Sequence, residues 1–493
     1  MSNIASMNLP FHDESVRCRA AQRVWSKLSM PERLRYVRRF RHLLAEGWEQ
    51  LALTVTQDVL RPTDEVLASD VLPTADACLF LERNARAILR PRRIPRSQRP
   101  LWLFGSKDAV HRRPHGIVGL IGTWNYPIFL NAVPIVQALT AGNGVLWKPS
   151  ELTPTVGAAL HDLFLQAGFP ADLLIRLPAT REAGPELAEA AIDHVVFVGS
   201  ADVGRKLARR LGERLVSSTL ELSGCDAMIV AEDANLPLAA KGAWFGATLN
   251  RGQTCLASRR IFVARSRYAE FLDLLRPLSA STESQPLMLW PQAEQAERLV
   301  TAALEGGAKL LHPEAVPKAE DDPPRFPRTF VIDARPEMAI CREASFAPIA
   351  AVIPFERLAD VVLAQAECPY ALAVSIFMGN RSQALRLAES FEAGMIAIND
   401  LLAPTAHPAT PFGGRGASGW GVTQGKEGLL EMTVPQVITH RGFTYRPHFA
   451  AADGTPPATT QMLKGMLLWC HGKRWRQRWS GFWQMLRGAW RSI

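Results

Sequence analysis

A single cysteine occupies a position suited to nucleophilic chemistry. Cys255 ends the run NRGQTC (250–255), so it follows a glycine turn and comes just before the β-rich segment RRIFV (259–263). A thiolate on such a turn can attack a carbonyl carbon and form a covalent intermediate. A free cysteine is more often a small buried hydrophobic residue, and Cys255 taken alone fits that description better. Chemistry at this thiol therefore depends on partner groups elsewhere in the chain.

A carboxylate in an earlier segment is one candidate partner. Glu221 lies near the end of the apolar run TLEL (219–222), and Ser223 and Gly224 follow it. At the end of a strand its carboxylate can face a cleft and act as a general base on a thiol or on water. Taken alone, Glu221 is better explained as a solvated surface charge.

The chain around both residues alternates between β-rich and helical runs. This alternation is typical of α/β proteins with parallel sheets. The runs fall into two groups without a fixed internal repeat, so we expect two βαβ-type units. The first group comprises GIVGLIG (116–122), GVLWK (144–148), HVVFVG (194–199), GRKLARRLGERL (204–215) and STLEL (218–222), and the second comprises IAAVIPF (349–355), LADVVLAQAE (358–367), AVSIFMG (373–379), QALRLAESFEAG (383–394) and MIAIND (395–400).

Two segments precede these runs. Ser29, Met30, Pro31 and Glu32 form a capping box with a first-turn proline, which predicts that a helix begins there. Residues 85–113 are rich in arginine and proline, and we expect them to be too broken for a long regular element. We interpret the second segment as a crossing between structural units.

The composition is that of a large globular protein. Of 493 residues, 47% are hydrophobic and 21% are charged. The seven cysteines are scattered and never spaced as CxxC, so we expect neither a disulfide framework nor a metal site, and a reducing compartment such as the cytoplasm fits best. We also expect no signal peptide or membrane span. The net charge of +9 comes without a nucleic-acid-binding module, so no nucleic-acid partner is expected.

Several segments, taken in order, resemble the motifs of the aldehyde dehydrogenase superfamily. The resemblance extends from about residue 20 to residue 443. It implies an α/β fold with a Rossmann-like cofactor domain, an α/β catalytic domain and a small oligomerisation hairpin. The segments are GTWNYP (122–127), WKPSELTP (147–154), FVGS (197–200) with Val203 and Gly204, TLELSG (219–224), NRGQTC (250–255), and PFGG (411–414) with Ser418 and Gly419.

The resemblance implies three catalytic residues and a covalent mechanism. Cys255 would attack an aldehyde, and the resulting oxyanion would be held by the Asn125 side chain and the Cys255 backbone N–H, a kind of contact worth about 3 to 4 kcal/mol. Loss of hydride would leave a thioester, and Glu221 would activate the water that hydrolyses it. Such a base works best with a pKa nearer neutrality than that of a free glutamate.

The resemblance also implies a nicotinamide cofactor. Lys148 and Glu151 would hold the adenine-side ribose, although an exposed ion pair between them is the simpler interpretation of these two residues alone. Glu151 favours NAD because a carboxylate repels a 2′-phosphate, and NADP stays open as the alternative. The other residues implied in cofactor binding are Thr123, Trp124, Ser150, Gly199, Ser200, Gly204, Leu222 and Phe346.

Three positions depart from the family pattern. Ala344 stands where a glutamate usually binds the nicotinamide ribose, and Glu343 is one residue out of register. Ser223 replaces a glycine after the general base, and Cys225 stands where a lysine usually follows Gly224. These departures bear on cofactor geometry rather than on the nucleophile.

The resemblance divides the chain into regions. It implies that subunits pair as a homodimer or homotetramer through a hairpin and a late strand. The expected regions are a cofactor-binding domain (1–95 and 115–223), a catalytic domain (224–431), oligomerisation elements (96–114 and 432–445), and a linker with a basic, tryptophan-rich tail (446–493).

The tail resembles an interfacial amphipathic helix. On a helical wheel its apolar residues gather on one side, and no acidic residue follows Asp453. We expect it to lie on an anionic membrane surface, and the alternative is packing on its own subunit or on a partner. Four glycines should weaken the helix. The gathered residues are Leu468, Trp475, Trp479, Phe482, Trp483, Leu486, Trp490 and Ile493.

The sequence therefore predicts NAD(P)-dependent oxidation of an aldehyde, apolar in kind, to its carboxylic acid, at or near a membrane. Two alternatives stay open. A coenzyme-A-acylating relative would share Cys255 but usually lacks the hydrolytic glutamate. A weakly active or inactive membrane-surface protein on the same fold would explain the departures at Ala344 and Ser223.

Overall fold

The computed structural model describes residues 9–103, 105–281, 283–313, 317–320, 322–442 and 457–490. Its second helix confirms the capping prediction. α2 spans Met30–Glu46, and the Glu32 carboxylate accepts a hydrogen bond from the Ser29 backbone N–H at 2.7 Å. Leu34, Val37 and Leu44 are buried on this helix, and Leu43 is partly buried beside them.

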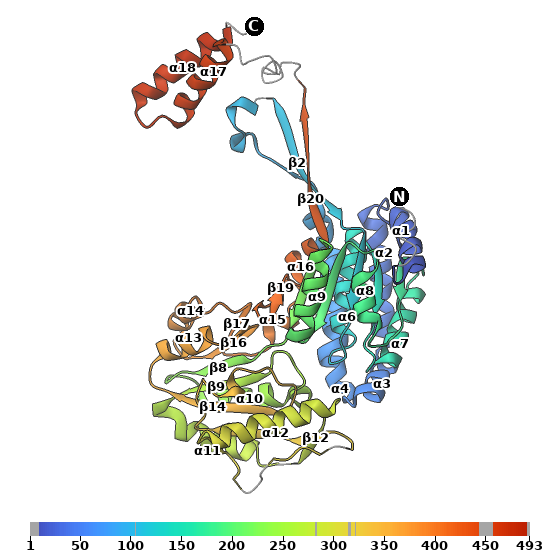
Figure 1. Cartoon of the computed structure of the whole chain (residues 1–493), viewed down its shortest axis with the longest axis vertical. Coiled ribbons are helices and arrows are strands. Elements are labelled where there is room, and N and C mark those ends of the chain that lie inside the picture. The colour runs from blue at the N-terminus through green and yellow to red at the C-terminus, as the bar shows by residue number, and fades with distance from the viewer. Residues whose placement is uncertain are drawn as a thin grey trace. The chain divides into compact units, whose positions relative to one another are not determined.

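A six-stranded sheet carries the first group of predicted strands (Figure 1). Five of its strands are parallel, and the short strand β19 adds to its edge in antiparallel fashion. Each of the four β-rich runs predicted from 116 to 222 forms a strand, and most of GRKLARRLGERL (204–215) lies in a helix, as predicted. The order is β19 (Gly419–Trp420), β7 (Ser217–Leu222), β6 (His194–Gly199), β3 (Ile117–Ile121), β4 (Gly144–Lys148) and β5 (Leu174–Arg176).

A seven-stranded sheet carries the second group and the strand that follows Cys255. All neighbours are parallel except β11 and β13. The two parallel sheets confirm the expected α/β fold class. The order is β11 (Lys309–Leu310), β13 (Thr329–Ile332), β14 (Ile349–Phe355), β9 (Ser258–Ala264), β8 (Asp226–Val230), β16 (Ala373–Phe377) and β17 (Met395–Ile398).

Helices cover both faces of each sheet, so each sheet is the middle of three layers. On the six-stranded sheet, one face packs on α2, α3 (Trp48–Val59), α5 (Leu72–Leu89), α6 (Phe129–Ala141) and α7 (Pro154–Gln166), and the other packs on α1 (His12–Trp25), α8 (Ala183–Glu189) and α9 (Ala201–Glu213). On the seven-stranded sheet, the corresponding helices are α10 (Leu236–Thr248) and α11 (Tyr268–Leu278) on one face, and α12 (Trp290–Glu305), α13 (Leu358–Ala366) and α14 (Arg381–Ala388) on the other. Other short helices of this part of the chain include α4 (Thr63–Val66), a π-helical turn (Leu67–Val71), α15 (Ala403–Ala406) and α16 (Gly425–Glu431).

Residues 85–113 are more regular than predicted. The segment begins inside α5 and ends in the nine-residue strand β2 (Ser106–Pro114), which lies between β1 (Arg92–Arg93) and β20 (Thr433–Arg441) in a three-stranded sheet. β2 pairs with β1 on one side and with β20, more than 300 residues later, on the other, where the Thr439 hydroxyl donates to the Asp108 carboxylate at 2.7 Å. Two small two-stranded sheets pair β10 (Ser284–Pro286) with β12 (Arg325–Pro327) and β15 (Tyr370–Ala371) with β18 (Arg415–Gly416).

The tail forms two helices where the sequence suggested one. α17 (Pro457–His471) and α18 (Trp475–Trp490) lie antiparallel and side by side (Figure 1). Leu468 therefore faces α18 from α17, and the prediction that it shares the tryptophan face is wrong, because the chain turns back between residues 472 and 474. Ile493 lies outside the described residues.

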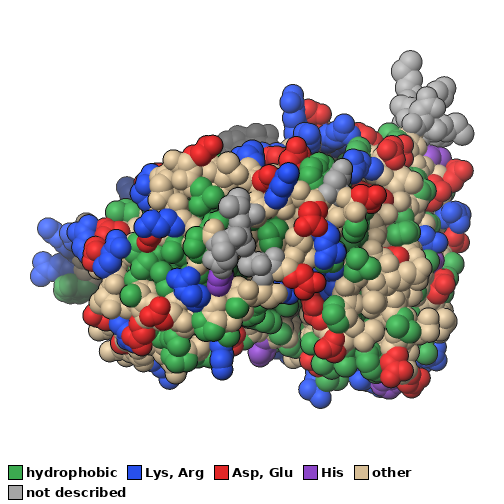
Figure 2. Space-filling view, turned by 90° about the horizontal axis from the view of Figure 1, so that it is seen from below, with side chains coloured by type: hydrophobic (Ala, Val, Ile, Leu, Met, Phe, Trp, Pro, Cys, Tyr) green, Lys and Arg blue, Asp and Glu red, His purple; other side chains and the backbone are tan. Residues whose placement is uncertain are grey.

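Contacts divide the chain into two compact units. One comprises Met1–Leu89 and Arg113–Val434 and contains both large sheets, and the other comprises Arg90–Arg112 and Pro435–Ile493. None of the described helices has the length and the apolar character that a membrane span requires, and in the same residues no group of three or more His, Cys, Asp or Glu side chains is placed to hold a metal. On the face that Figure 2 shows, acidic and basic side chains are interspersed.

Candidate active site

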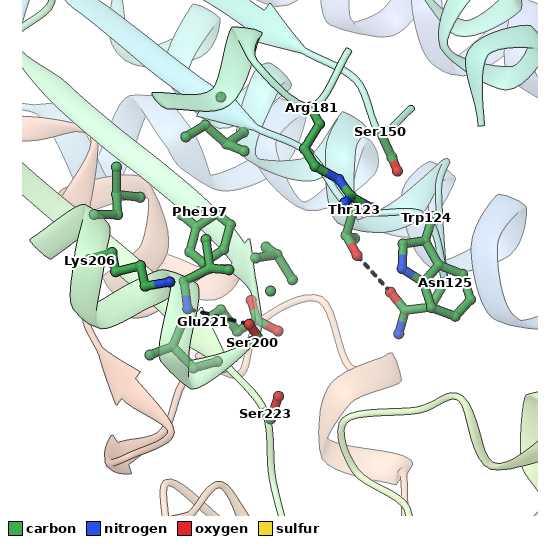
Figure 3. Close-up of a pocket in the computed structure, with 18 of the residues that line it drawn as sticks. Thr123, Trp124, Asn125, Ser150, Arg181, Phe197, Ser200, Lys206, Glu221 and Ser223 are labelled. Atoms are coloured by element: carbon green, nitrogen blue, oxygen red, sulfur yellow. Dashed lines mark hydrogen bonds between the residues drawn. The ribbon is translucent and has the colours of Figure 1, made fainter. Parts of the chain in front are cut away.

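A cavity of about 980 Å³ brings the predicted residues together. All predicted site residues except Gly204 line it, so segments that are remote in the sequence converge here. Figure 3 shows Thr123, Trp124 and Asn125 on one side of the cavity and Phe197 and Ser200 on the other. The lining residues include Thr123, Trp124, Asn125, Lys148, Ser150, Glu151, Gly199, Ser200, Glu221, Leu222, Cys255 and Phe346.

The nucleophile follows a strained loop. Asn250, Arg251 and Gly252 have positive φ angles of 47°, 57° and 74°, which is uncommon for the first two. A Cβ on Gly252 would also lie 2.3 Å from the Ala347 carbonyl oxygen, so only glycine fits. Such strain persists only where surrounding contacts hold it. The loop therefore aims Cys255, which is partly exposed, into the cavity.

Two arginines hold this loop in place. The Arg251 guanidinium donates to the carbonyls of Val59 at 2.6 Å and Leu60 at 3.2 Å, at the end of α3. The buried Arg259 on β9 donates to the Gly252 carbonyl. Neither contact could be predicted from the sequence, because the acceptors in both are backbone carbonyls.

The side chain of Asn125 is held by hydrogen bonds to both ends of its amide group. Its side-chain amide donates to the Gln253 carbonyl at 3.2 Å, and its amide oxygen accepts from the Thr123 hydroxyl at 3.0 Å. The next residue, Tyr126, shares a hydrogen bond of 2.7 Å with the hydroxyl of Thr254. The segment that carries Asn125 is thus fastened directly to the segment that carries Cys255.

A buried ion pair supports the Asn125 segment. Arg61 and Asp70 are 1% and 0% exposed, and their charged groups lie 2.5 Å apart. Arg61 also donates to the Asn125 carbonyl at 3.1 Å and lies over the Tyr126 ring at 4.6 Å. The other Asp70 oxygen accepts the backbone N–H of Phe129 at 2.8 Å, at the start of α6. Arg61 therefore links α6 to the candidate oxyanion hole.

Glu221 is a buried carboxyl with one unpartnered oxygen. It is 2% exposed, its Oε2 accepts from the Thr423 hydroxyl at 3.4 Å, and no hydrogen bond reaches its Oε1. Burial raises the pKa of Glu221 to about 8, and the Thr423 hydrogen bond opposes that rise. A carboxyl with such a pKa can hold and release a proton near neutrality.

Burial also raises the pKa of the Cys255 thiol, and the negative charges of Glu221 and Asp226 raise it further. The resting thiol is therefore protonated and needs a base before it can attack. Gly224 brings the backbone close to this thiol's residue, because a Cβ there would lie 2.5 Å from the Cys255 carbonyl oxygen. The turn after β7 thus places the Glu221 strand against the nucleophile.

The other end of the cavity carries a charged cluster. The Lys148 ammonium lies 2.6 Å from Oε2 of Glu151, and the Arg181 guanidinium lies 3.7 Å from Oε1. The Lys148 hydrogen bond, against the effect of burial, lowers the pKa of Glu151. Lys148 is buried, so this pair is more than the exposed ion pair that the sequence alone suggested.

The N-terminus of α9 opens into the same cavity. Ser200 is its N-cap and accepts from the Val203 backbone N–H at 3.4 Å, and Gly199 precedes it. A helix N-terminus presents unpaired N–H groups that suit a phosphate. Gly204 does not line the cavity; it lies behind Leu222, whose side chain would be 2.6 Å from a Cβ at that position.

The predicted departures have structural consequences. The Trp124 and Phe346 rings lie edge to face, with centroids 6.0 Å apart, and Ala344 lines the cavity beside them. Glu343 pairs with Arg298 at 2.5 Å and does not line the cavity, so it does not replace the missing glutamate. The Gln295 amide, which donates to the Ala344 carbonyl at 3.2 Å, is a polar lining group nearby.

Some site residues could not be predicted from the sequence, because only the folded structure brings them to the site. Arg61, Arg181, Gln295 and Thr423 come from segments without a recognisable motif. Only the folded chain places Thr423 at Glu221 and Arg181 at Glu151. Nothing in the local sequence around these four residues distinguishes them from surface polar groups.

The fold and this site define an aldehyde dehydrogenase: the chain belongs to the aldehyde dehydrogenase family, whose model matches residues 14–438. It is 32% identical over 433 residues to the 4,4'-diapolycopene aldehyde oxidase of a Methylomonas species, covering 85% of this chain and 79% of that one. The NAD+ complex of a Bacillus cereus aldehyde dehydrogenase superposes with a TM-score of 0.81 at 26% identity, covering 87% and 88%. An Escherichia coli NADP-dependent enzyme superposes with a TM-score of 0.81 at 25% sequence identity. The match covers 87% of this chain and 89% of that one.

Proposed function

We propose that the chain oxidises an apolar aldehyde to its carboxylic acid with NAD, through a thioester on Cys255. The observation that carries the proposal is the meeting of Cys255, Glu221 and Asn125 in one cavity, where Glu221 is buried with a free oxygen. A nucleophile, a base of raised pKa and an amide donor are the groups that such a reaction needs.

Each residue has a step. Glu221 takes the thiol proton, because burial and negative charge raise the pKa of Cys255 and a base is needed. The thiolate forms a bond to the aldehyde carbon, and the Asn125 amide and the Cys255 backbone N–H stabilise the resulting oxyanion. After oxidation to the thioester, Glu221 gives up the thiol proton to solvent and, again a carboxylate, deprotonates a water molecule that attacks the acyl carbon, and the thiolate leaves.

The cavity fits a dinucleotide. Its volume, the Lys148–Glu151 pair and the N-terminus of α9 offer room, ribose partners and a phosphate site. Lys148, Glu151, Ser150 and Thr123 would hold the adenine half, and Trp124, Leu222 and Phe346 would flank the nicotinamide half. The bound cofactor supplies the hydride acceptor. NAD is preferred because of Glu151, and NADP is the alternative, since structural neighbours include both kinds.

An apolar substrate is supported by two observations. The Methylomonas relative is named for a diapolycopene aldehyde. The chain also carries a basic, tryptophan-rich tail that can bring the enzyme to the surface of a membrane, where apolar aldehydes collect. In this proposal the enzyme is peripheral at that surface.

In this proposal the two large sheets belong to domains with different roles. Residues 1–95 and 115–223 bind the cofactor, and residues 224–431 supply the nucleophile. The segments 96–114 and 432–445, which contain the strands β2 and β20, pair subunits in a homodimer or homotetramer, because β20 exposes Val437 and Ile438. An exposed apolar strand at a sheet edge is suited to such pairing.

NADH formation across a series of aldehyde chain lengths tests the function. We expect kcat/KM to rise with chain length, Cys255→Ala to abolish turnover, and Glu221→Gln to slow both the first turnover, which needs the thiol proton removed, and the hydrolysis that follows. Full activity of Cys255→Ala would refute the mechanism. Acyl-coenzyme A formed on addition of coenzyme A would identify an acylating enzyme, and absence of both NADH formation and NAD binding would identify an inactive surface protein.

A further inference from the structure

α18 has two opposite faces. At about 100° per residue, Trp475, Trp479, Trp483 and Trp490 fall on one side of the helix, and Gly481 and Gly488 fall on the other. The structure agrees, because the glycines are buried and the tryptophans are 72%, 60%, 49% and 86% exposed. We call the four tryptophans the tryptophan face. Its members span about 22 Å of helix.

The glycines form the contact between α17 and α18. A Cβ on Gly481 would lie 2.5 Å from the Trp469 backbone nitrogen, and one on Gly465 would lie 2.2 Å from the Met485 backbone nitrogen. A Cβ on Gly488 would lie 2.4 Å from the Met462 nitrogen. No side chain fits at these distances, so the two backbones touch along a glycine seam made of Gly465, Gly481 and Gly488.

The seam corrects the expectation that the glycines weaken the tail. Each glycine costs helix propensity, yet each allows the two helices to pack closely. The Trp469 and Phe482 rings meet with centroids 5.1 Å apart, and Arg478 donates to the Trp469 carbonyl at 3.0 Å. The tail is thus a packed helical hairpin, and the tryptophan face is held outward by it.

All formal charges on the hairpin are positive. Lys and Arg occupy six positions from 457 to 490, and Asp and Glu occupy none. On the wheel Arg476 and Arg487 lie along one flank of the tryptophan face, and Arg474 and Arg478 lie along the other. An apolar stripe edged on both sides by cations complements an anionic lipid surface, where tryptophan lies at headgroup depth.

We propose that the tryptophan face docks α18 flat on an anionic bilayer, with α17 stacked on its far side across the glycine seam. The inference deepens the membrane part of the proposed function and rests on it for its biological meaning. The docking face is preformed, so binding does not require the tail to fold. Leu463 and Leu467, on the outer face of α17, point away from the lipid.

Flotation of the full-length protein with vesicles tests this orientation. On vesicles of equal parts phosphatidylglycerol and phosphatidylcholine, we expect the triple variant Trp475→Ala, Trp479→Ala, Trp483→Ala to bind at least about tenfold more weakly than the unmodified chain. The matched control, Leu463→Ala with Leu467→Ala, should bind within about twofold of it. Pure phosphatidylcholine, or high salt, should weaken binding by at least about tenfold.

Three results would overturn the proposal. The first is that the triple variant binds vesicles as tightly as the unmodified chain. The second is that the leucine control loses binding instead. The third is that the unmodified chain does not bind vesicles while the triple variant changes oligomeric state, which would mean that a second copy of the chain covers the tryptophan face. Gly481→Leu provides a separate test. The leucine side chain should force α17 and α18 apart, so we expect the hairpin to unfold at a lower temperature and vesicle binding to weaken.

Turnover of a water-soluble aldehyde separates the two proposals. The tryptophan variants should keep full activity on it. Vesicle binding without aldehyde oxidation would refute the proposed function and support the docking face. Aldehyde oxidation without vesicle binding would support the proposed function and refute the docking face.

Discussion

The hydroxyl of Thr423 donates to the buried carboxylate of Glu221 at 3.4 Å. It is the one described group that lowers the pKa of Glu221 against burial, which raises that pKa to about 8. The base is therefore tuned by a residue outside every catalytic motif. The two groups together set the pH range in which the thioester can be hydrolysed.

Thr423→Val should move the pH profile of steady-state turnover. Glu221 activates water as the carboxylate, so the hydrolytic rate rises with pH through its pKa. Without the hydroxyl the pKa rises further, and we expect the acidic limb to shift upward by about half a unit. Stopped-flow NADH bursts at each pH separate hydrolysis from oxidation. A shift to lower pH would contradict this assignment.

Glu221→Gln should change the pH dependence of stability. The folded-state pKa is raised above the ordinary value of 4.5, so the folded protein binds this proton more tightly than the unfolded chain. Below about pH 4.5 the carboxyl is protonated in both the folded and the unfolded protein, so it causes no difference in stability between the wild type and the glutamine variant. As the pH rises toward 8, the wild type progressively loses stability. Urea unfolding should show the glutamine variant more stable by at least about 1 kcal/mol at pH 8 and equal at pH 4.

Arg61→Met should damage both stability and catalysis. It leaves the buried Asp70 carboxylate unpaired, which costs about 3 to 5 kcal/mol. The Asn125 carbonyl loses a donor, so we expect kcat to fall about tenfold in the folded fraction. Adding Asp70→Asn should restore part of the stability. Arg17→Met, which breaks an exposed pair with Asp172, is the matched control and should cost no more than about 1 kcal/mol.

Two glycines of α9 should respond oppositely to alanine. Nothing lies within 4 Å of a Cβ on Gly212, so Gly212→Ala should stabilise the protein by about 0.5 to 1 kcal/mol. At Gly204 the new methyl would lie 2.6 Å from Leu222, which lines the cavity. Gly204→Ala should destabilise by about 1 to 3 kcal/mol and raise KM for NAD. Equal melting temperatures for the two variants would contradict this packing.

Glu151→Gln should shift cofactor preference. Removing the carboxylate frees Lys148 and Arg181, which lie 2.6 and 3.7 Å from it. We expect kcat/KM for NADP relative to NAD to rise about tenfold, because repulsion of the 2′-phosphate is lost. In the same background Arg181→Gln should reverse most of the gain. An unchanged ratio would place the 2′-hydroxyl elsewhere.

Local patterns predicted local structure well. The capping box at Ser29 and Glu32 and the β-rich runs from 116 to 222 form the expected elements, because capping and periodicity act over a few residues. Composition alone indicated a broken segment at 85–113, and the hairpin and late strand that contain β2 and β20 were expected only from the family resemblance, since their pairing links segments that the sequence leaves far apart.

The site was predictable wherever a family motif carried it. The cavity gathers Cys255, Glu221 and Asn125, whose motifs the sequence displays. Arg61 and Arg181 act through contacts that depend on tertiary structure alone. The tail glycines show the same limit, because a glycine that lowers helix propensity and one that forms a helix contact look identical in the sequence.

The pairing of β19 with β7 has a consequence for synthesis of the chain. Gly419 aligns with Glu221, and Thr423 reaches the same carboxylate from 202 residues further along. A ribosome releases the Glu221 strand long before either partner exists. The strand must wait at an open sheet edge, so a nascent or truncated chain can fold much of its first sheet and still lack a tuned base, and activity should appear only at the last stage of production.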